Sequence, residues 1–76
     1  MARVERIEKN YFGVTLYITT RTGKVYACRA DTWTSLPGGK LRVAVRTWPG
    51  YGHYRGAVIL SRAEKATFLK AFTIEV

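Results

Sequence analysis

Two short segments that alternate apolar and polar residues, Val14 to Thr19 and Lys24 to Ala30, lie on either side of a tight turn. Such alternation, with β-branched residues, is typical of strands, because successive side chains of a strand point to opposite faces. The intervening Thr20-Arg21-Thr22-Gly23 suits a type I turn that ends with glycine in the left-handed region. The turn fixes the register of the hairpin, since a slip of one residue would exchange its two faces.

This register predicts which side chains of the hairpin reach the core. The inward face is expected to hold the more apolar set: Val14, Leu16, Ile18, Tyr26, Cys28 and Ala30. The outward face is expected to hold the remaining residues of the two strands: Thr15, Tyr17, Thr19, Val25, Ala27 and Arg29.

Other segments predict further strands and one helix. Residues 40–47 alternate, with Leu41, Val43 and Val45 expected toward the core. Residues 56–60 form a short apolar run that suits a central strand, and residues 3–7 and 73–76 are further strand candidates. Residues 31–39, punctuated by Pro37-Gly38-Gly39, are expected to form a loop.

The sequence Ser61-Arg62-Ala63-Glu64 matches the capping box that begins many helices. It predicts a helix from this point to about Phe72. The apolar residues expected to share one face of this helix are Ala66, Phe68, Leu69 and Phe72.

Together these elements predict an α+β fold, a small antiparallel β-sheet of three to five strands with one C-terminal helix packed on one face. The chain of 76 residues, 47% hydrophobic, suits a single folded domain spanning residues 1–76. The helix would cover one face of the sheet and leave the other open to solvent. We expect that open face to carry Tyr17, Arg29, Arg42 and Arg46.

Cysteine usage and hydropathy bear on the location of the protein. Cys28 is the only cysteine, so no internal disulfide can form. The longest aliphatic run, residues 57–60, is far shorter than the roughly 20 residues of a membrane span, and the N-terminus lacks the apolar region of a signal peptide. We therefore expect a cytoplasmic protein with no membrane span.

Residues 32–63 contain no acidic residue, and this window holds several arginines together with both tryptophans. Thirteen Lys and Arg in the whole chain against five Asp and Glu give a net charge of +8. Such an excess favours association with nucleic acid or an anionic membrane through a sequence-independent electrostatic term. Because the basic residues are interleaved with flat aromatic rings, on which nucleobases can stack, nucleic acid is the leading hypothesis.

Two parts of the window carry most of the candidate binding residues. Arg42 and Arg46 are four residues apart on one predicted strand, which puts them roughly 13 Å apart on the same side. No acidic residue of that strand pairs with either arginine. The second part, residues 47–56, places large aromatic rings, His53 and Arg55 among glycines. Rings exposed there would stack bases at about 1–3 kcal/mol each; alternatively, Trp48 and Tyr54 fold back onto the sheet as a small core.

The predicted interface, for nucleic acid or another partner, therefore consists of Tyr17, Arg29, Lys40, Arg42, Arg46, Trp48, Tyr51, His53, Tyr54 and Arg55.

The sequence predicts no catalytic, metal or cofactor site. His53 is the only histidine and Asp31 the only aspartate, so neither a zinc site nor a positioned general base is indicated. Cys28 lies on the predicted core face, where it would behave as a small apolar residue. The glycines that follow Pro37 belong to a hairpin loop, with no helix after it to supply an anion-binding N-terminus.

We therefore expect a non-enzymatic module that binds DNA or RNA through an open basic sheet face and an aromatic, glycine-rich loop. The alternative is a small accessory protein of the phage or plasmid type that binds and inhibits a host protein or nucleoprotein complex, because protein interfaces favour the same residue types. Such a partner would offer an acidic or a nucleic-acid-binding surface. A third interpretation is a structural subunit that oligomerises through edge strands such as residues 73–76.

Overall fold

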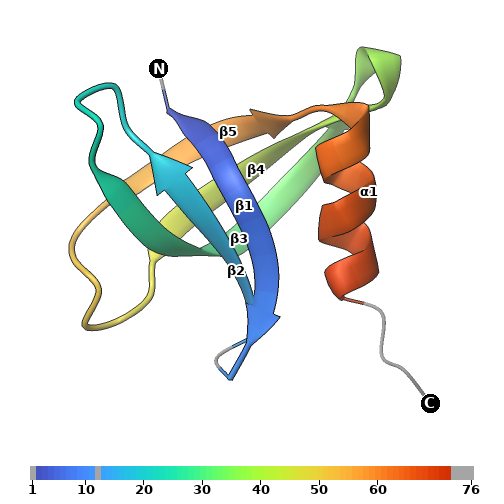
Figure 1. Ribbon diagram of the computed structural model, residues 1–76. Helices are drawn as coiled ribbons and strands as arrows, with labels where there is room; N and C mark the ends of the chain where they lie inside the picture. Colours follow the sequence, from blue (N-terminus) through green and yellow to red (C-terminus); the bar gives the residue numbers. More distant parts are fainter. Residues whose placement is uncertain (1, 12, 73–76) are drawn as a thin grey trace.

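The computed structural model describes residues 2–11 and 13–72. Five strands follow one another along the chain: β1 (Arg3–Asn10), β2 (Gly13–Thr19), β3 (Val25–Leu36), β4 (Lys40–Thr47) and β5 (Arg55–Leu60). The short 3-10 turn η1 (Pro37–Gly39) joins β3 to β4, and helix α1 (Arg62–Ala71) follows β5. The strands lie in the sheet in the order of the chain and every neighbouring pair is antiparallel, which confirms the predicted α+β class (Figure 1).

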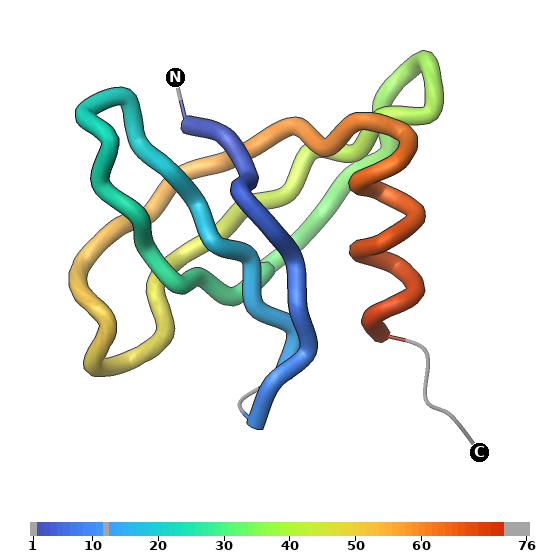
Figure 2. Tube along the Cα trace, in the orientation of Figure 1, coloured from blue at the N-terminus to red at the C-terminus, as the bar shows by residue number. Residues whose placement is uncertain are grey.

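The sheet is strongly bent, so that its first and last strands, β1 and β5, contact each other (Figures 1 and 2). Between these two strands the described residues form no ladder. Strand twist makes such bending natural, because a twisted meander can wrap around its own apolar face. The sheet is thus an open barrel with a core-facing inner side and an outer side exposed to solvent.

The core is built from apolar residues of β2 to β5 and one residue of the helix. Its buried members are Val14, Leu16, Ile18, Cys28, Leu41, Val43, Val45, Val58, Leu60 and Phe68. The pairs Leu16 with Cys28 and Ile18 with Tyr26 give the hairpin its predicted register. Every residue predicted to face inward on β2, β3 and β4 is either buried or packed against this core.

Two local predictions, the first turn and the helix cap, are confirmed in their hydrogen bonds. The Gly23 amide donates to the Thr20 carbonyl at 2.9 Å, with Gly23 at a φ of +88°. The Ser61 hydroxyl accepts a bond from the Glu64 amide at 3.2 Å, and the Glu64 carboxylate accepts one from the Ser61 amide at 2.9 Å. Both features are set by residues close in sequence, which is why the sequence predicts them.

The loop predicted for residues 31–39 is wrong, because β3 continues to residue 36. The β3–β4 register shifts between Ala30 and Thr32, which places a β-bulge at Asp31. Before the bulge the odd-numbered residues of β3 face outward, and Asp31 remains on that side. After the extra residue the alternation is reversed, so Trp33 faces inward opposite Val43. The β-branched and aromatic residues 32–34 have strong strand propensity, which prevails over the aspartate and the Pro-Gly signal that follows.

Helix α1 closes the end of the barrel next to η1 (Figure 1). Its only buried residue, Phe68, contacts Trp33 edge to face at 5.2 Å between ring centroids and Phe72 at 4.9 Å. The predicted apolar face of the helix is only partly covered, since Leu69 and Phe72 remain 41% and 43% exposed. The curved sheet offers the helix a narrow contact, which leaves the sides of that face in solvent.

A pair of stacked tyrosines packs against the core at the other end of the sheet. The rings of Tyr26 and Tyr54 lie 5.1 Å apart with an interplanar angle of 13°. A Cβ atom on Gly56 would lie 2.7 Å from the Tyr54 hydroxyl oxygen, so glycine is needed for this close approach.

Two expectations about the strands at the chain's end have different outcomes. The strand at residues 56–60 is an edge strand rather than a central one, and Ile59 on it is 59% exposed. The strand expected at residues 73–76 lies outside the described residues. No helix in the described ranges has the length and apolar character needed to cross a membrane.

Candidate functional site

Three arginines lie side by side on the outer side of β3, β4 and β5. Arg29 is paired with Arg46 across β3 and β4, and Arg46 is paired with Arg55 across β4 and β5. Neighbouring strands are about 4.8 Å apart, so this arginine row spans roughly 10 Å. Like charges directly opposite each other in a sheet are destabilising, and the row therefore concentrates positive charge at a cost to the free protein.

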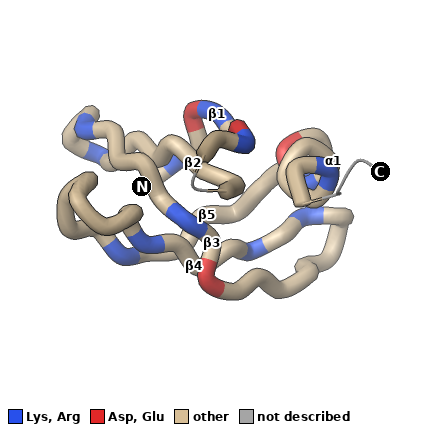
Figure 3. Tube along the Cα trace, turned by 90° about the horizontal axis from the view of Figure 1, so that it is seen from below, with Lys and Arg blue, Asp and Glu red and all other residues tan. Residues whose placement is uncertain are grey.

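A single carboxylate, that of Asp31, offsets part of this charge. Asp31 is the only acidic residue between Glu8 and Glu64, a stretch that includes all of β2 to β5. Lys and Arg therefore outnumber Asp and Glu along these strands (Figure 3).

Asp31 contacts two members of the arginine row. Its Oδ1 lies 3.0 Å from Nε of Arg46 and 3.7 Å from Nε of Arg29. The Arg46 contact is an ion pair without hydrogen-bond geometry. The sequence predicts no acidic partner for Arg46 on its own strand, and the partner comes instead from the bulge of the neighbouring strand. Arg55 makes no ion pair within the described residues.

Two shallow hollows adjoin the arginine row and share Arg46, Thr47 and His53. One has a volume of about 360 Å³ and the other of about 320 Å³. We call the arginine row and these hollows together the basic site. The predicted interface residues that it brings together are Arg29, Arg46, Trp48, His53, Tyr54 and Arg55.

The loop that borders the hollows is held to the end of β4 by Thr47. The Thr47 hydroxyl donates to the Gly52 carbonyl at 2.8 Å and accepts a bond from the Tyr54 amide at 3.3 Å. The backbone of Thr47 also donates to the Tyr54 carbonyl at 3.0 Å. Gly50 and Gly52 have φ values of +87° and +107°, which the turn requires and glycine allows. Sequence reasoning missed Thr47 and Asp31. The signals that could have found them are a polar residue directly before Trp48-Pro49-Gly50 and an acid two residues after Arg29.

The two largest rings at the site fold back onto the protein. Trp48 Nε1 donates to the Thr15 hydroxyl at 3.0 Å, and Thr15 is fully buried although it faces outward on β2. The Arg29 guanidinium lies 5.5 Å from the Trp48 ring centroid. Tyr54 is stacked on Tyr26. The folded-back arrangement is therefore the one observed for both Trp48 and Tyr54.

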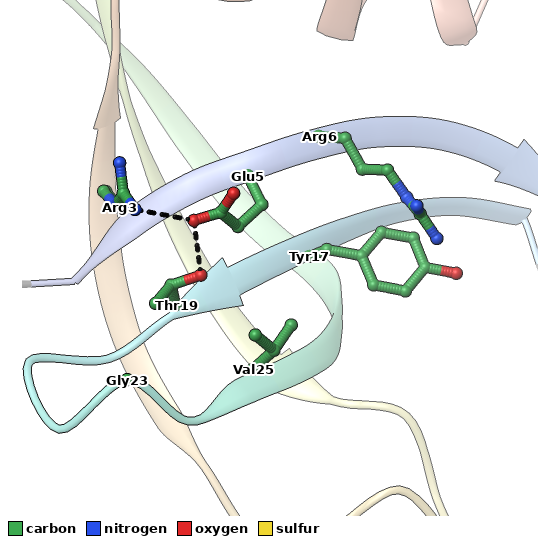
Figure 4. Close-up of a pocket in the computed structure, with 7 residues that line it drawn as sticks. All are labelled: Arg3, Glu5, Arg6, Tyr17, Thr19, Gly23 and Val25. Atoms are coloured by element: carbon green, nitrogen blue, oxygen red, sulfur yellow. Dashed lines mark hydrogen bonds and ion pairs between the residues drawn. The ribbon is translucent and has the colours of Figure 1, made fainter.

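Tyr17 lies in a different hollow, of about 580 Å³, on the outer side of β1 to β3 (Figure 4). Its hydroxyl donates to the Glu8 carboxylate at 3.0 Å, and the Arg6 guanidinium sits 4.2 Å from its ring centroid. Arg3 pairs with Glu5 at 3.0 Å in the same region (Figure 4). Arg6 pairs with Glu8 at 3.4 Å, so each of the two arginines that line this hollow has a carboxylate partner.

The remaining predicted residues lie around the basic site rather than in it. Arg42 is on the outer side of β4, roughly 13 Å from Arg46, and has no ion-pair partner within the described residues. Lys40 lies at the start of β4, next to η1 and farther from the row. Tyr51 is half exposed in the loop after β4.

Two observations concern the thiol and the possible metal ligands of the described residues. Burial raises the pKa of the Cys28 thiol to about 11, so this group is protonated at neutral pH and is a poor nucleophile. No group of three or more His, Cys, Asp or Glu in the described ranges could hold a metal ion.

No protein-family model, curated protein or solved structure matches this chain. The geometry and charge of the basic site therefore carry the functional inference.

Proposed function

We propose that this protein is a non-enzymatic module that binds nucleic acid through the basic site. The observation that carries the proposal is the arginine row, in which Arg29, Arg46 and Arg55 are neighbours across three strands. The carboxylate of Asp31 contacts Arg29 and Arg46 but not Arg55. Their mutual repulsion is unfavourable in the free protein. A phosphate backbone would offset it, and guanidinium groups bind phosphate oxygens with paired hydrogen bonds.

Phosphate contacts rather than base stacking are the basis of this proposal. Both contacts of Asp31 involve Nε atoms, so the terminal nitrogens of Arg29 and Arg46 remain able to donate to a ligand. Exposed His53 adds a further donor at the rim of both hollows. The surrounding rings stabilise the loop that shapes this surface.

Fluorescence anisotropy of labelled DNA and RNA at several salt concentrations tests the proposal. Three phosphate contacts on a duplex give a slope of log affinity against log salt of about −2.7, so affinity falls about 40-fold between about 50 and 200 mM salt. Arg46→Gln or Arg55→Gln should weaken binding and make the slope about 0.9 less steep. Lys70→Gln, which removes the same charge from the helix, is the matched control. Unchanged binding by both arginine variants would exclude the basic site.

A second candidate is an accessory protein of the phage or plasmid type that binds a host protein or nucleoprotein complex. The observation that favours it is the exposed apolar group at the end of α1, where Trp33, Leu69 and Phe72 are each about two-fifths exposed. Aromatic residues of this kind are enriched in protein interfaces. A pull-down after nuclease treatment tests this function. Capture of one stoichiometric protein that is lost with Trp33→Ser but retained with Arg46→Gln would favour it over nucleic-acid binding.

A further inference from the structure

We infer that the nucleic acid bound at the basic site is double-stranded and is held through its phosphates, independently of base sequence. This inference rests on the proposed function and narrows it to one class of polymer. Three features of the outer side of the sheet carry it: the state of the aromatic rings, the layout of the arginines, and the residues that lie between them.

Trp48 and Tyr54, the tryptophan and tyrosine that line the basic site, lack the arrangement that single-stranded ligands need. Modules for single strands present aromatic faces on which successive bases stack. Here Trp48 is fixed by its hydrogen bond to buried Thr15 and by the guanidinium of Arg29. Tyr54 is stacked on Tyr26. Both rings are part of the protein's own packing, so stacking of bases on them would require the loop to rearrange.

The arginines form a two-dimensional array rather than a line. The row extends roughly 10 Å across the strands, and Arg42 lies roughly 13 Å from Arg46 along β4. A single strand offers one line of phosphates. A duplex offers two phosphate rows that border a groove, about 12 Å across for the major groove of DNA, at a density of one charge per about 1.7 Å of axis. Arg42 and Arg46 can therefore contact opposite borders of one groove.

The residues between Arg42 and the row are short. Ala44 lies between Arg42 and Arg46 on β4, and its neighbours on β3 and β5 are Thr32 and Ala57. The bidentate hydrogen bonds that discriminate most strongly between bases come from longer polar side chains, such as Asn, Gln or a second Arg, that reach into a groove. None of these types occupies the middle of the array. Contacts with the backbone position a protein without selecting a sequence, which is the mode this surface allows.

Binding of a labelled single strand, a DNA duplex and an RNA duplex of equal length tests the inference. Four phosphate contacts, from Arg42 and the row, have a salt slope of about −3.6 on a duplex and about −2.8 on a single strand. If the duplex and the single strand bind equally at about 1 M salt, this difference in slope makes the duplex bind about sixfold more tightly at about 0.1 M salt. Duplexes rich in A·T and in G·C pairs should bind with affinities within about twofold of each other, since phosphate contacts carry no sequence information.

The outcomes separate the inference from the proposed function. Duplex preference with equal affinity for both base compositions, and a duplex salt slope about 0.9 less steep in Arg42→Gln, supports the inference. Tighter binding of the single strand, or strong dependence on base sequence, refutes the inference and leaves the proposed function standing. Absence of salt-dependent binding to all three polymers refutes both. Lys70→Gln again controls for net charge, and preference between the DNA and RNA duplex identifies the source of the phosphates.

Discussion

Replacing Asp31 with asparagine removes the one carboxylate of the arginine row and keeps the size of the side chain at the bulge. The two ion pairs that it breaks, at 3.0 and 3.7 Å, join groups that are about one-third to two-fifths exposed. Solvent screening limits such pairs to about 0.5–1 kcal/mol in total. We therefore expect Asp31→Asn to lower the free energy of unfolding by about this amount. The loss should be smaller at about 1 M salt, where the screening length falls to about 3 Å, comparable with the two contact distances.

The same substitution should strengthen binding of nucleic acid. A phosphate bound to the row would lie about 6 Å from the Asp31 carboxylate, and in water their repulsion is about 0.7 kcal/mol. Its removal corresponds to about threefold tighter binding at low salt. Asp31→Asn is thus expected to trade stability of the free protein for affinity.

Urea unfolding followed by circular dichroism measures the first effect, and anisotropy with a labelled duplex measures the second. Glu5→Gln is the matched control, because Glu5 also makes one exposed ion pair, with Arg3 at 3.0 Å, and its loss changes net charge equally. Glu5 lies on β1 and does not line the basic site. If Glu5→Gln tightens binding as much as Asp31→Asn, the effect comes from net charge and the local reasoning is refuted.

Three further predictions concern the core and can be measured by urea unfolding. Phe68→Ala should lower the free energy of unfolding by about 3–5 kcal/mol, because it empties the only fully buried position of the helix. A loss below about 1 kcal/mol would mean that the helix contributes little to stability. Gly56→Ala should lower the free energy of unfolding by about 1–3 kcal/mol, since the new Cβ would displace the Tyr54 hydroxyl. Ala57→Gly, at the next position and on the outer side, is its control. The pKa of the Cys28 thiol is raised by burial from 9.0 to about 11, so its contribution to stability is complete below about pH 9. About 3 kcal/mol is lost as pH rises through about 11. Cys28→Ala should show a correspondingly weaker pH dependence of the free energy of unfolding over this range.

Much of the fold follows from local patterns in the sequence. The alternation around Leu16 and Cys28 sets the inner side of the hairpin, and Gly23 and Ser61 place a turn and a helix start through their own conformational preferences. Each of these signals depends on residues close together in the chain. The bending of the sheet does not, because it results from the sum of strand twists and from the contact between β1 and β5.

The candidate site likewise combines features set by local sequence patterns with features set by tertiary contacts. Alternation correctly puts Arg29, Arg42 and Arg46 on one side of the sheet. The row itself depends on which residues pair across strands, and the Asp31 bulge that brings a carboxylate to it is a tertiary feature. The fate of Trp48 depends on a hydrogen bond to Thr15, which is 33 positions away in the chain, so no local pattern could decide between an exposed ring and a folded-back one.

The two tryptophans of this chain sit in separate environments of the fold. Trp33 lies on the inner side of β3 against the rings of α1, whereas Trp48 lies on the outer side beside Arg29. Their fluorescence should therefore report different events. In a variant that keeps only Trp33, emission would follow the docking of the helix; in one that keeps only Trp48, it would follow occupation of the basic site. Folding and ligand binding could then be recorded in one titration without any attached dye.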